Sequence, residues 1–209
     1  MTKVPILLLG AGGHARACID VIEEEGRFGI AGLVGLPEQV GSKVLGYPVV
    51  GTEADLPVLS GSYSHALIVV GQINTPDLRM RLFNLLEQGC WTTPLIVSPR
   101  AHASRHATLG AGTIVMHGVV VNAGAVVGRN CIINNQALVE HDAVIGDHCH
   151  VATAAIVNGD ARVGAGTFIG SGSGIRNGIT LGERCLIGMG QQVLKNCDAG
   201  TRMPPRKPA

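Results

Sequence analysis

The chain has 209 residues and a formal net charge of +1, with 16 lysines and arginines against 15 aspartates and glutamates. This balance gives no electrostatic footprint for nucleic acid or an anionic membrane surface, and no apolar run approaches the roughly 20 residues that span a bilayer. Aromatic residues make up only 3% of the chain while 30 residues are glycine, so the core must consist of small and aliphatic side chains. The apolar start MTKVPILLLGAGG runs into glycines rather than a cleavage site, and the six cysteines form no CxxC pair. Both features predict a cytoplasmic protein with reduced thiols.

The first 90 residues alternate apolar runs with helical patterns. Three apolar runs predict buried strands, at residues 4–10, 28–35 and 65–71. Two amphipathic segments predict helices, at residues 15–26 and 75–89. Gly26 ends the first helix, and the second has Thr75 as its cap, Pro76 at its first position and Gly89 at its end. Strands that alternate with helices predict a Rossmann-like α/β domain over residues 1–90.

The loop between the first strand and the first helix contains Gly10, Gly12 and Ala15 in the order G-x-G-x-x-A. In this context the backbone N–H groups would approach a phosphate at a helix N-terminus. A nicotinamide coenzyme would also need an acid after the second strand, but no Asp or Glu occurs there before Glu38. We therefore expect a nucleotide diphosphate or a sugar at this loop rather than a dehydrogenase site, and a tight turn without a ligand is the alternative.

A six-residue repeat dominates the rest of the chain. From Leu109 to Val193 every sixth residue is aliphatic, the residue after it is often glycine, and the residue four places after it is small or slim. This hexapeptide pattern is typical of a left-handed parallel β-helix, in which three hexads form one triangular coil of 18 residues. We expect residues 91–209 to form this β-helix. Three cysteines fall in the slim, inward position and are predicted to be core residues: Cys131, Cys149 and Cys185.

The repeat assigns directions to the polar residues of the segment NNQALVEHDAVIGDHCHVAT (134–153). Five of them point outward or lie at corners: Glu140, His141, Asp142, His148 and His150. Residues 18 apart stack, so His141 lies beside Gly159. His141 and His150 are half a coil apart, so they lie on different sides of the prism and cannot readily share a ligand within one chain. Such β-helices commonly form trimers, and a site could therefore combine His141 of one chain with His150 of its neighbour.

Metal binding is the rival interpretation of these histidines. Gamma-class carbonic anhydrases place zinc between left-handed β-helices with three histidine ligands. The spacing of His141, His148 and His150 does not match that pattern, and those enzymes lack an N-terminal sheet domain. We therefore expect no metal.

The whole chain resembles the hexapeptide-repeat sugar acetyltransferases, namely the sialic acid O-acetyltransferases and the UDP-4-amino-sugar N-acetyltransferases. The resemblance rests on the segments LLLGAGGHA, LGYPVVG (45–51), VVGQIN (69–74) and EHDAVIGDHCHV, followed by the hexads. It implies a homotrimer that uses acetyl-CoA to N-acetylate a nucleotide-linked amino sugar in surface-glycan biosynthesis, with no nucleic acid or membrane partner. The alternatives are O-acetylation of a sialic-acid-like sugar and a catalytically silent trimeric scaffold that binds a sugar nucleotide.

The resemblance also implies roles for individual residues. The catalytic set is the general base His141, the acid Asp142 that raises its basicity, and the neighbouring Glu140 and Asn134. The coenzyme groove comprises His150 at the thioester end, Gly159, Ser171, Gly188 and Met189. The nucleotide-sugar loop comprises Gly12, Gly13, His14 and Gly71.

A neutral imidazole can remove the acceptor's proton near pH 7 without a protein nucleophile, so direct transfer in a ternary complex is expected. A backbone N–H or His150 could donate to the developing oxyanion. Two features depart from the family pattern. Relatives usually carry an acidic pair after the second strand, where this chain has Val34–Pro37, and the tail TRMPPRKPA differs from the usual ending. In the tail, Arg202, Arg206 and Lys207 are candidates for contacts with CoA phosphates.

Overall fold

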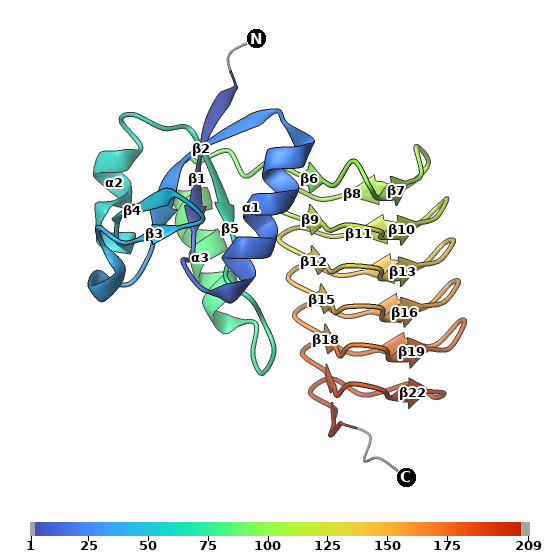
Figure 1. Cartoon of the computed structure of the whole chain (residues 1–209). Helices are drawn as coiled ribbons and strands as arrows, with labels where there is room; N and C mark the ends of the chain where they lie inside the picture. The colour runs from blue at the N-terminus through green and yellow to red at the C-terminus, as the bar shows by residue number, and fades with distance from the viewer. Residues whose placement is uncertain (1–2, 206–209) are drawn as a thin grey trace.

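The computed structural model describes residues 3–205 and contains an α/β part followed by a prism of stacked coils (Figure 1). Arg206 and Lys207, two of the predicted CoA contacts, lie outside the described residues. The α/β part consists of β1 (Val4–Leu9), α1 (Gly13–Glu25), β2 (Phe28–Val34), η1 (Pro37–Gln39), β3 (Lys43–Val44), β4 (Tyr47–Gly51), η2 (Glu53–Asp55), α2 (Leu56–Leu59), β5 (His65–Ile68) and α3 (Asp77–Gln88). Its sheet has the strand order β3-β4-β2-β1-β5. All pairs are parallel except β3 with β4.

Strand β1 is buried on both faces, which explains its continuous apolar run. Ile6 and Leu8 pack with α1 in one core cluster, while Leu7 and Leu9 pack with α3 in another. The two helices therefore cover opposite faces of the sheet. The three predicted strands and both predicted helices are confirmed, and Gly26 ends α1 in the left-handed conformation.

The second helix begins slightly later than the sequence indicates. Residue Pro76 precedes α3 rather than opening it, and the helix starts at Asp77. The N-cap residue is therefore Pro76 rather than the predicted Thr75, whose hydroxyl accepts the N–H of Asp77 at 3.2 Å from one position further out. The antiparallel pair β3–β4 was not predicted at all.

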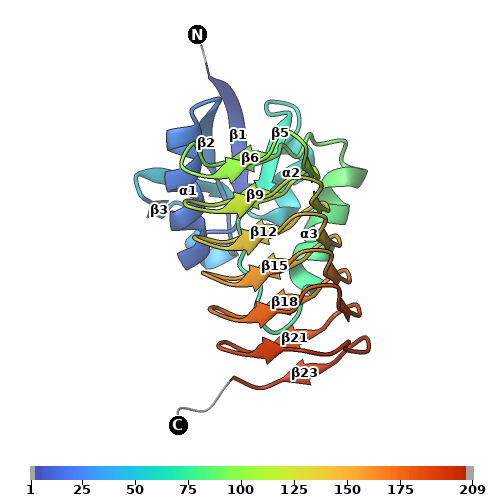
Figure 2. The same ribbon diagram turned by 90° about the vertical axis from the view of Figure 1, so that its right-hand side faces the viewer.

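The prism has three faces, and each is a sheet of parallel two-residue strands (Figures 1 and 2). The junction face, which lies against the α/β part, contains β6 (Ile96–Val97), β9 (Ile114–Val115), β12 (Ile132–Ile133), β15 (His150–Val151), β18 (Phe168–Ile169), β21 (Leu186–Ile187) and β23 (Arg202–Met203). The second face contains β7 (His102–Ala103), β10 (Val120–Val121), β13 (Leu138–Val139), β16 (Ile156–Val157), β19 (Gly174–Ile175) and β22 (Gln192–Val193). The third face contains β8 (Thr108–Leu109), β11 (Val126–Val127), β14 (Val144–Ile145), β17 (Arg162–Val163) and β20 (Thr180–Leu181).

The register confirms the 18-residue coil, because Val121 pairs with Val139, which pairs with Val157. The aliphatic positions, apart from the partly buried Leu109, and the slim positions, including the three cysteines, are buried inside. The glycines after the aliphatic residues have a steric reason. A Cβ at Gly164 or Gly170 would lie 2.5 Å from the backbone of the next coil, too close for any side chain.

The β-helix begins before the first residue of the predicted repeat. Strands β6 and β7 place Val97 and Ala103 at the same six-residue spacing that leads to Leu109. Alanine at position 103 breaks the aliphatic pattern, so the sequence signal starts two hexads late. Over residues 3–205, no helix has the length and apolar character needed to cross a membrane.

Candidate active site

A cavity of about 580 Å³ lies at the carboxyl ends of β1, β2 and β5, and we call it the loop cavity. The glycine loop Gly10–His14 lines it together with residues 34–36 and 69–71. A Cβ built on Gly12 or Gly13 meets no atom within 4 Å. These two glycines are therefore not required by packing, and they leave open space beside the N-terminus of α1. The cavity lies where parallel α/β sheets bind ligands.

His14 stands between this cavity and the β-helix. Its Nε2 is buried and has no hydrogen-bond partner among residues 3–205. Burial, followed by the charge of Arg79 and the nearby ring of His150, lowers the pKa of His14 to about 4. The ring is therefore neutral at pH 7. The ring centroids of His14 and His150 are 6.4 Å apart.

His150 points out of the β-helix as predicted, but the α/β part buries it. Its Nδ1 lies 2.6 Å from the carbonyl oxygen of Gln72, which can only accept, so Nδ1 carries the proton. Burial lowers the pKa of His150 to about 4, and the neutral ring therefore has an acceptor at Nε2. Asn134 occupies this acceptor, with Nδ2 at 3.2 Å. The expected donation from His150 to an oxyanion is therefore wrong for this tautomer.

A buried arginine joins the two parts of the chain. Arg79 on α3 is 1% exposed and donates to the carbonyl of Val70 at 2.6 Å and to Oδ1 of Asn130 at 2.7 Å. Asn130 also contacts Nδ1 of His148 at 2.9 Å, and Gln72 donates to the carbonyl of His148 at 3.0 Å. Burial lowers the pKa of Arg79 only to about 10, so the guanidinium stays charged. His148 lies at a corner, as predicted, and this network buries it.

His141 lies at the corner between the second and third faces, exposed to solvent. Its Nδ1 donates to Oδ2 of Asp142 at 2.9 Å, and its backbone N–H donates to Glu140 at 3.2 Å. The hydrogen bond to the Asp142 carboxylate, and then the carboxylate charges of Asp142 and Glu140, raise the pKa of His141. Asn122 in turn holds Glu140 at 2.8 Å. The arrangement leaves Nε2 of His141 as a free acceptor of a proton.

Gly159 makes room for this imidazole. A Cβ at Gly159 would lie 2.7 Å from Cε1 and 2.8 Å from Nε2 of His141. The amide of Asn177, one coil further on, would lie 3.3 Å from the same point. The imidazole therefore rests over the bare backbone of Gly159, as the stacking of residues 18 apart predicted.

Two further predicted coenzyme residues lie on the corner of the β-helix that carries Asn134. Ser171 and Met189 are 18 residues apart on the corner that follows the junction face, and Met189 is exposed. A Cβ at Gly188 would lie 2.3 Å from the nitrogen of Pro205, so close packing of the tail already requires glycine there.

One chain thus carries two separate half-sites. The base half-site comprises His141, Asp142, Glu140 and Gly159. The loop half-site comprises the loop cavity, His14, His150, Asn134, Ser171 and Met189. The structure does not bring the two together within one chain, because they occupy different corners of the prism.

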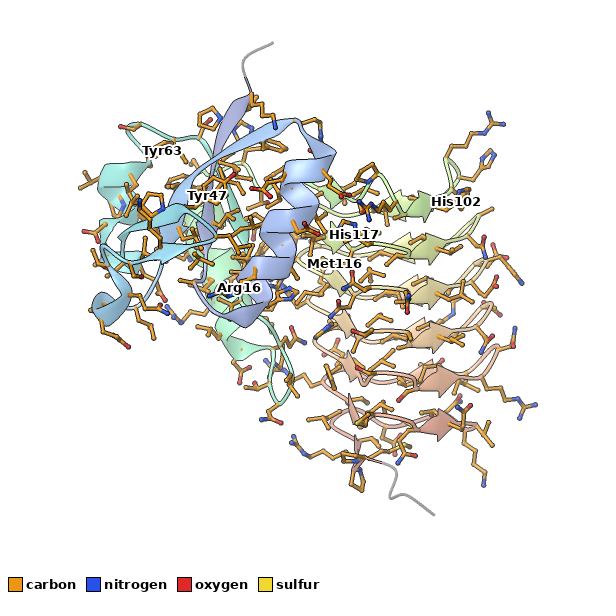
Figure 3. All side chains as sticks on the ribbon, in the orientation of Figure 1. Arg16, Tyr47, Tyr63, His102, Met116 and His117 are labelled. Carbon is orange, nitrogen blue, oxygen red and sulfur yellow. The ribbon has the colours of Figure 1, made fainter. Side chains whose placement is uncertain are left out.

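Sequence reasoning missed a third constellation, Ser98, His117 and Asp20. Figure 3 shows His117 between α1 and the β-helix. Its Nε2 donates to Asp20 at 2.9 Å, and Ser98 Oγ lies 2.7 Å from its Nδ1. Ser98 is only 1% exposed and its oxygen also accepts the N–H of Arg100 at 3.0 Å. This serine is inaccessible to a substrate, and the trio fastens α1 to the β-helix. Over the described ranges, no group of three His, Cys, Asp or Glu side chains could hold a metal ion.

Two family models match parts of the chain. The PglD N-terminal domain matches residues 5–86, and the hexapeptide repeat of succinyl-transferase matches residues 161–195. No curated protein matches the sequence.

Solved structures match nearly the whole chain. PerB from Caulobacter crescentus, in complex with CoA and GDP-perosamine, is 30% identical with a TM-score of 0.88, over 95% of this chain and 92% of that one. The acetyltransferase domain of PglB from Neisseria gonorrhoeae FA1090, in complex with acetyl coenzyme A, is 27% identical with a TM-score of 0.89, over 100% of both chains. WeeI from Acinetobacter baumannii AYE, at 22% identity, a TM-score of 0.84 and 97% coverage of both chains, supports the fold alone.

These similarities confirm the predicted fold class, a Rossmann-like α/β part followed by a left-handed parallel β-helix. They also identify the co-substrate, because the matched acetyltransferases contain CoA or acetyl-CoA. The chain therefore belongs to the hexapeptide-repeat sugar acetyltransferases and is an acetyltransferase that uses acetyl-CoA.

Proposed function

We propose that the protein transfers acetyl from acetyl-CoA to the amine of a nucleotide-linked amino sugar, in surface-glycan biosynthesis. The observation that carries this proposal is the His141–Asp142 pair, whose free Nε2 lies over the bare backbone of Gly159. The relative PerB, solved with GDP-perosamine, supports a nucleotide-linked amino sugar as the acceptor. Structures of perosamine N-acetyltransferase from the same organism carry a histidine replaced by asparagine or alanine.

His141 acts as the general base in this proposal. Acetyl-CoA supplies the acetyl group as an activated thioester. His141 Nε2 takes the proton that the amine loses as its nitrogen bonds to the acetyl carbon and the carbon–sulfur bond breaks. Asp142 keeps the other nitrogen protonated, which aims Nε2 outward and stabilises the imidazolium. The proton then passes to the departing CoA sulfur, so no protein nucleophile takes part.

The loop cavity binds the nucleotide sugar, and residues 1–90 serve as the nucleotide-sugar domain. The open space beside Gly12 and Gly13 admits the phosphates to the backbone N–H groups at the start of α1. His14 and Gly71 line the same cavity. A neutral His14 with an unpartnered Nε2 can hydrogen-bond a sugar hydroxyl.

Acetyl-CoA fits the rest of the loop half-site. Both ring nitrogens of His150 are occupied, by the Gln72 carbonyl and by Nδ2 of Asn134, so His150 positions Asn134. The second N–H of the Asn134 amide can donate to a carbonyl of the pantetheine arm. Ser171 and Met189 lie one coil apart on the same corner of the β-helix as Asn134 and extend this surface. These residues bind and orient the co-substrate, while residues 91–209 form the acetyltransferase domain.

Because the two half-sites lie on different corners, we propose a homotrimer in which His141 of one chain faces the loop half-site of its neighbour. Sedimentation velocity combined with an activity assay tests this arrangement. An active monomer would contradict it.

The central experiment measures thiol release from acetyl-CoA with UDP-, dTDP- and GDP-linked 4-amino sugars and free sialic acid as acceptors. Wild type should release thiol with an amino-sugar nucleotide, and His141→Ala should lower the rate by about 10²- to 10⁴-fold. His102→Ala, an exposed histidine on the second face (Figure 3), is the matched control. Release only with sialic acid would favour O-acetylation, and no release with any acceptor would favour the silent scaffold.

A further inference from the structure

Two charged side chains of the loop cavity have no part in the proposed chemistry. Besides His14, Glu53 and Arg81 are the only ionisable groups that line the cavity within residues 3–205. Arg81 donates to the two oxygens of Glu53 in a fork, at 2.6 Å and 2.9 Å. The pair joins α3 to η2, which directly follows β4. It therefore forms one polar edge on the cavity wall, with an acceptor and a donor side by side.

The position of Glu53 is fixed by the backbone before it. The carboxylate of Asp55 accepts the N–H of Thr52 at 2.7 Å and its hydroxyl at 3.0 Å, which holds the turn that carries Glu53. A Cβ at Gly51 would lie 2.9 Å from the same carboxylate, so the turn packs tightly against β4. The carboxylate–guanidinium edge is thus already in place before a ligand binds.

The cavity also contains exposed apolar side chains. Leu36, Ile73 and Leu78 line it and are 58%, 63% and 43% exposed, respectively. Large apolar side chains that gather around one cavity favour a ligand with apolar faces. A nucleotide base has such faces, and its edge carries N–H donors beside acceptors.

We infer that Glu53 and Arg81 read the base of the nucleotide that carries the sugar. Glu53 accepts an N–H from the base edge, Arg81 donates to the acceptor beside it, and the three apolar side chains cover the faces of the ring. A carboxylate would repel the phosphates, so the Glu53 end of the cavity suits the uncharged base, while the glycine loop holds the phosphates. This inference rests on the proposed function, in which the cavity binds the nucleotide.

The test measures the dissociation constants of GDP, UDP, dTDP, ADP and CDP by calorimetry. Wild type should prefer one base, and Glu53→Gln should reduce that preference by about tenfold. Glu38→Gln removes a neighbouring exposed carboxylate that does not line the cavity, and it should leave the preference unchanged. An equal loss of affinity for all five diphosphates would assign the pair to the phosphates or to the fold, and would overturn the inference, as would no change in Glu53→Gln.

Exchanging the two residues separates base reading from a structural ion pair. The double variant Glu53→Arg, Arg81→Glu keeps the pair but reverses donor and acceptor. A structural role predicts the wild-type preference, whereas base reading predicts an altered one. Thiol release measured on the same proteins separates the two proposals. If the protein transfers acetyl but its base preference does not depend on Glu53, only this inference is wrong. If the base preference depends on Glu53 but no acceptor is acetylated, only the proposed function is wrong.

Discussion

Replacing Gly159 with alanine tests whether His141 works in the position that the structure gives it. The added Cβ would lie 2.7 Å from Cε1 of His141. Ordinary contact begins at 3.4 Å, so the two atoms would be about 0.7 Å too close. Gly159 has no left-handed backbone, and Ala123 occupies the same position two coils earlier, so alanine fits the main chain. The exposed imidazole must therefore move. A displacement approaching 1 Å costs a positioned catalytic group about 10²-fold in rate.

The assay is kcat/KM for thiol release, with a double-mutant cycle as the control. Gly159→Ala should lower kcat/KM about a hundredfold in wild type but have little effect in His141→Ala, because the displaced group is already gone. Gly29→Ala, whose Cβ would make an ordinary 3.4 Å contact, controls for the general effect of alanine. A folded Gly159→Ala protein within threefold of wild type would refute the reasoning. Equal losses in both backgrounds would show that Gly159 acts on the substrate rather than on His141.

Three further outcomes are expected. The raised pKa of His141 means that the neutral base is populated only above this pKa, so kcat/KM should rise with pH through a pKa above 6.5. In Asp142→Asn the rise of kcat/KM should occur at lower pH and reach a lower plateau. If the pH of this rise does not change, His141 is not the titrating base. Arg79→Met should lower the free energy of unfolding by about 2 to 4 kcal/mol, because it orphans buried carbonyl groups; urea denaturation checks this, and an unchanged midpoint would contradict the junction role. Incubation with labelled acetyl-CoA alone should leave no label on the protein, and a stable acetyl-enzyme in mass spectrometry would disprove direct transfer.

The β-helix could be predicted almost entirely because each position of its hexad is subject to one steric requirement. An aliphatic residue every sixth place must fill a narrow interior, and glycine must follow wherever the next coil approaches within 3 Å. The directions of His141 and Asp142 followed from that register alone. The pattern failed only where a small residue takes the aliphatic position, as Ala103 does in the first coil.

The junction could not be predicted in the same way, because its burial arises from contacts between segments far apart in sequence. Gln72 and His150 are 78 residues apart, and only their hydrogen bond shows that the outward-facing imidazole is buried and neutral. One signal was present for Arg79. It lies on α3 at helical spacing from the buried residues Leu82, Phe83 and Leu86, which places it on the core face of that helix.

The same coil geometry is the basis of the proposed trimer. A residue's place in the hexad assigns it to one face or corner for the whole length of the prism, so no adjustment along the chain can move His141 beside the loop cavity. Because the Arg79 network fixes the α/β part to the junction face, that part also cannot swing around to His141. In the proposed mechanism, His141 therefore meets the acceptor across a contact between chains. Dissociation should therefore abolish transfer while each chain still binds its nucleotide, and this difference separates a loss of assembly from a loss of folding.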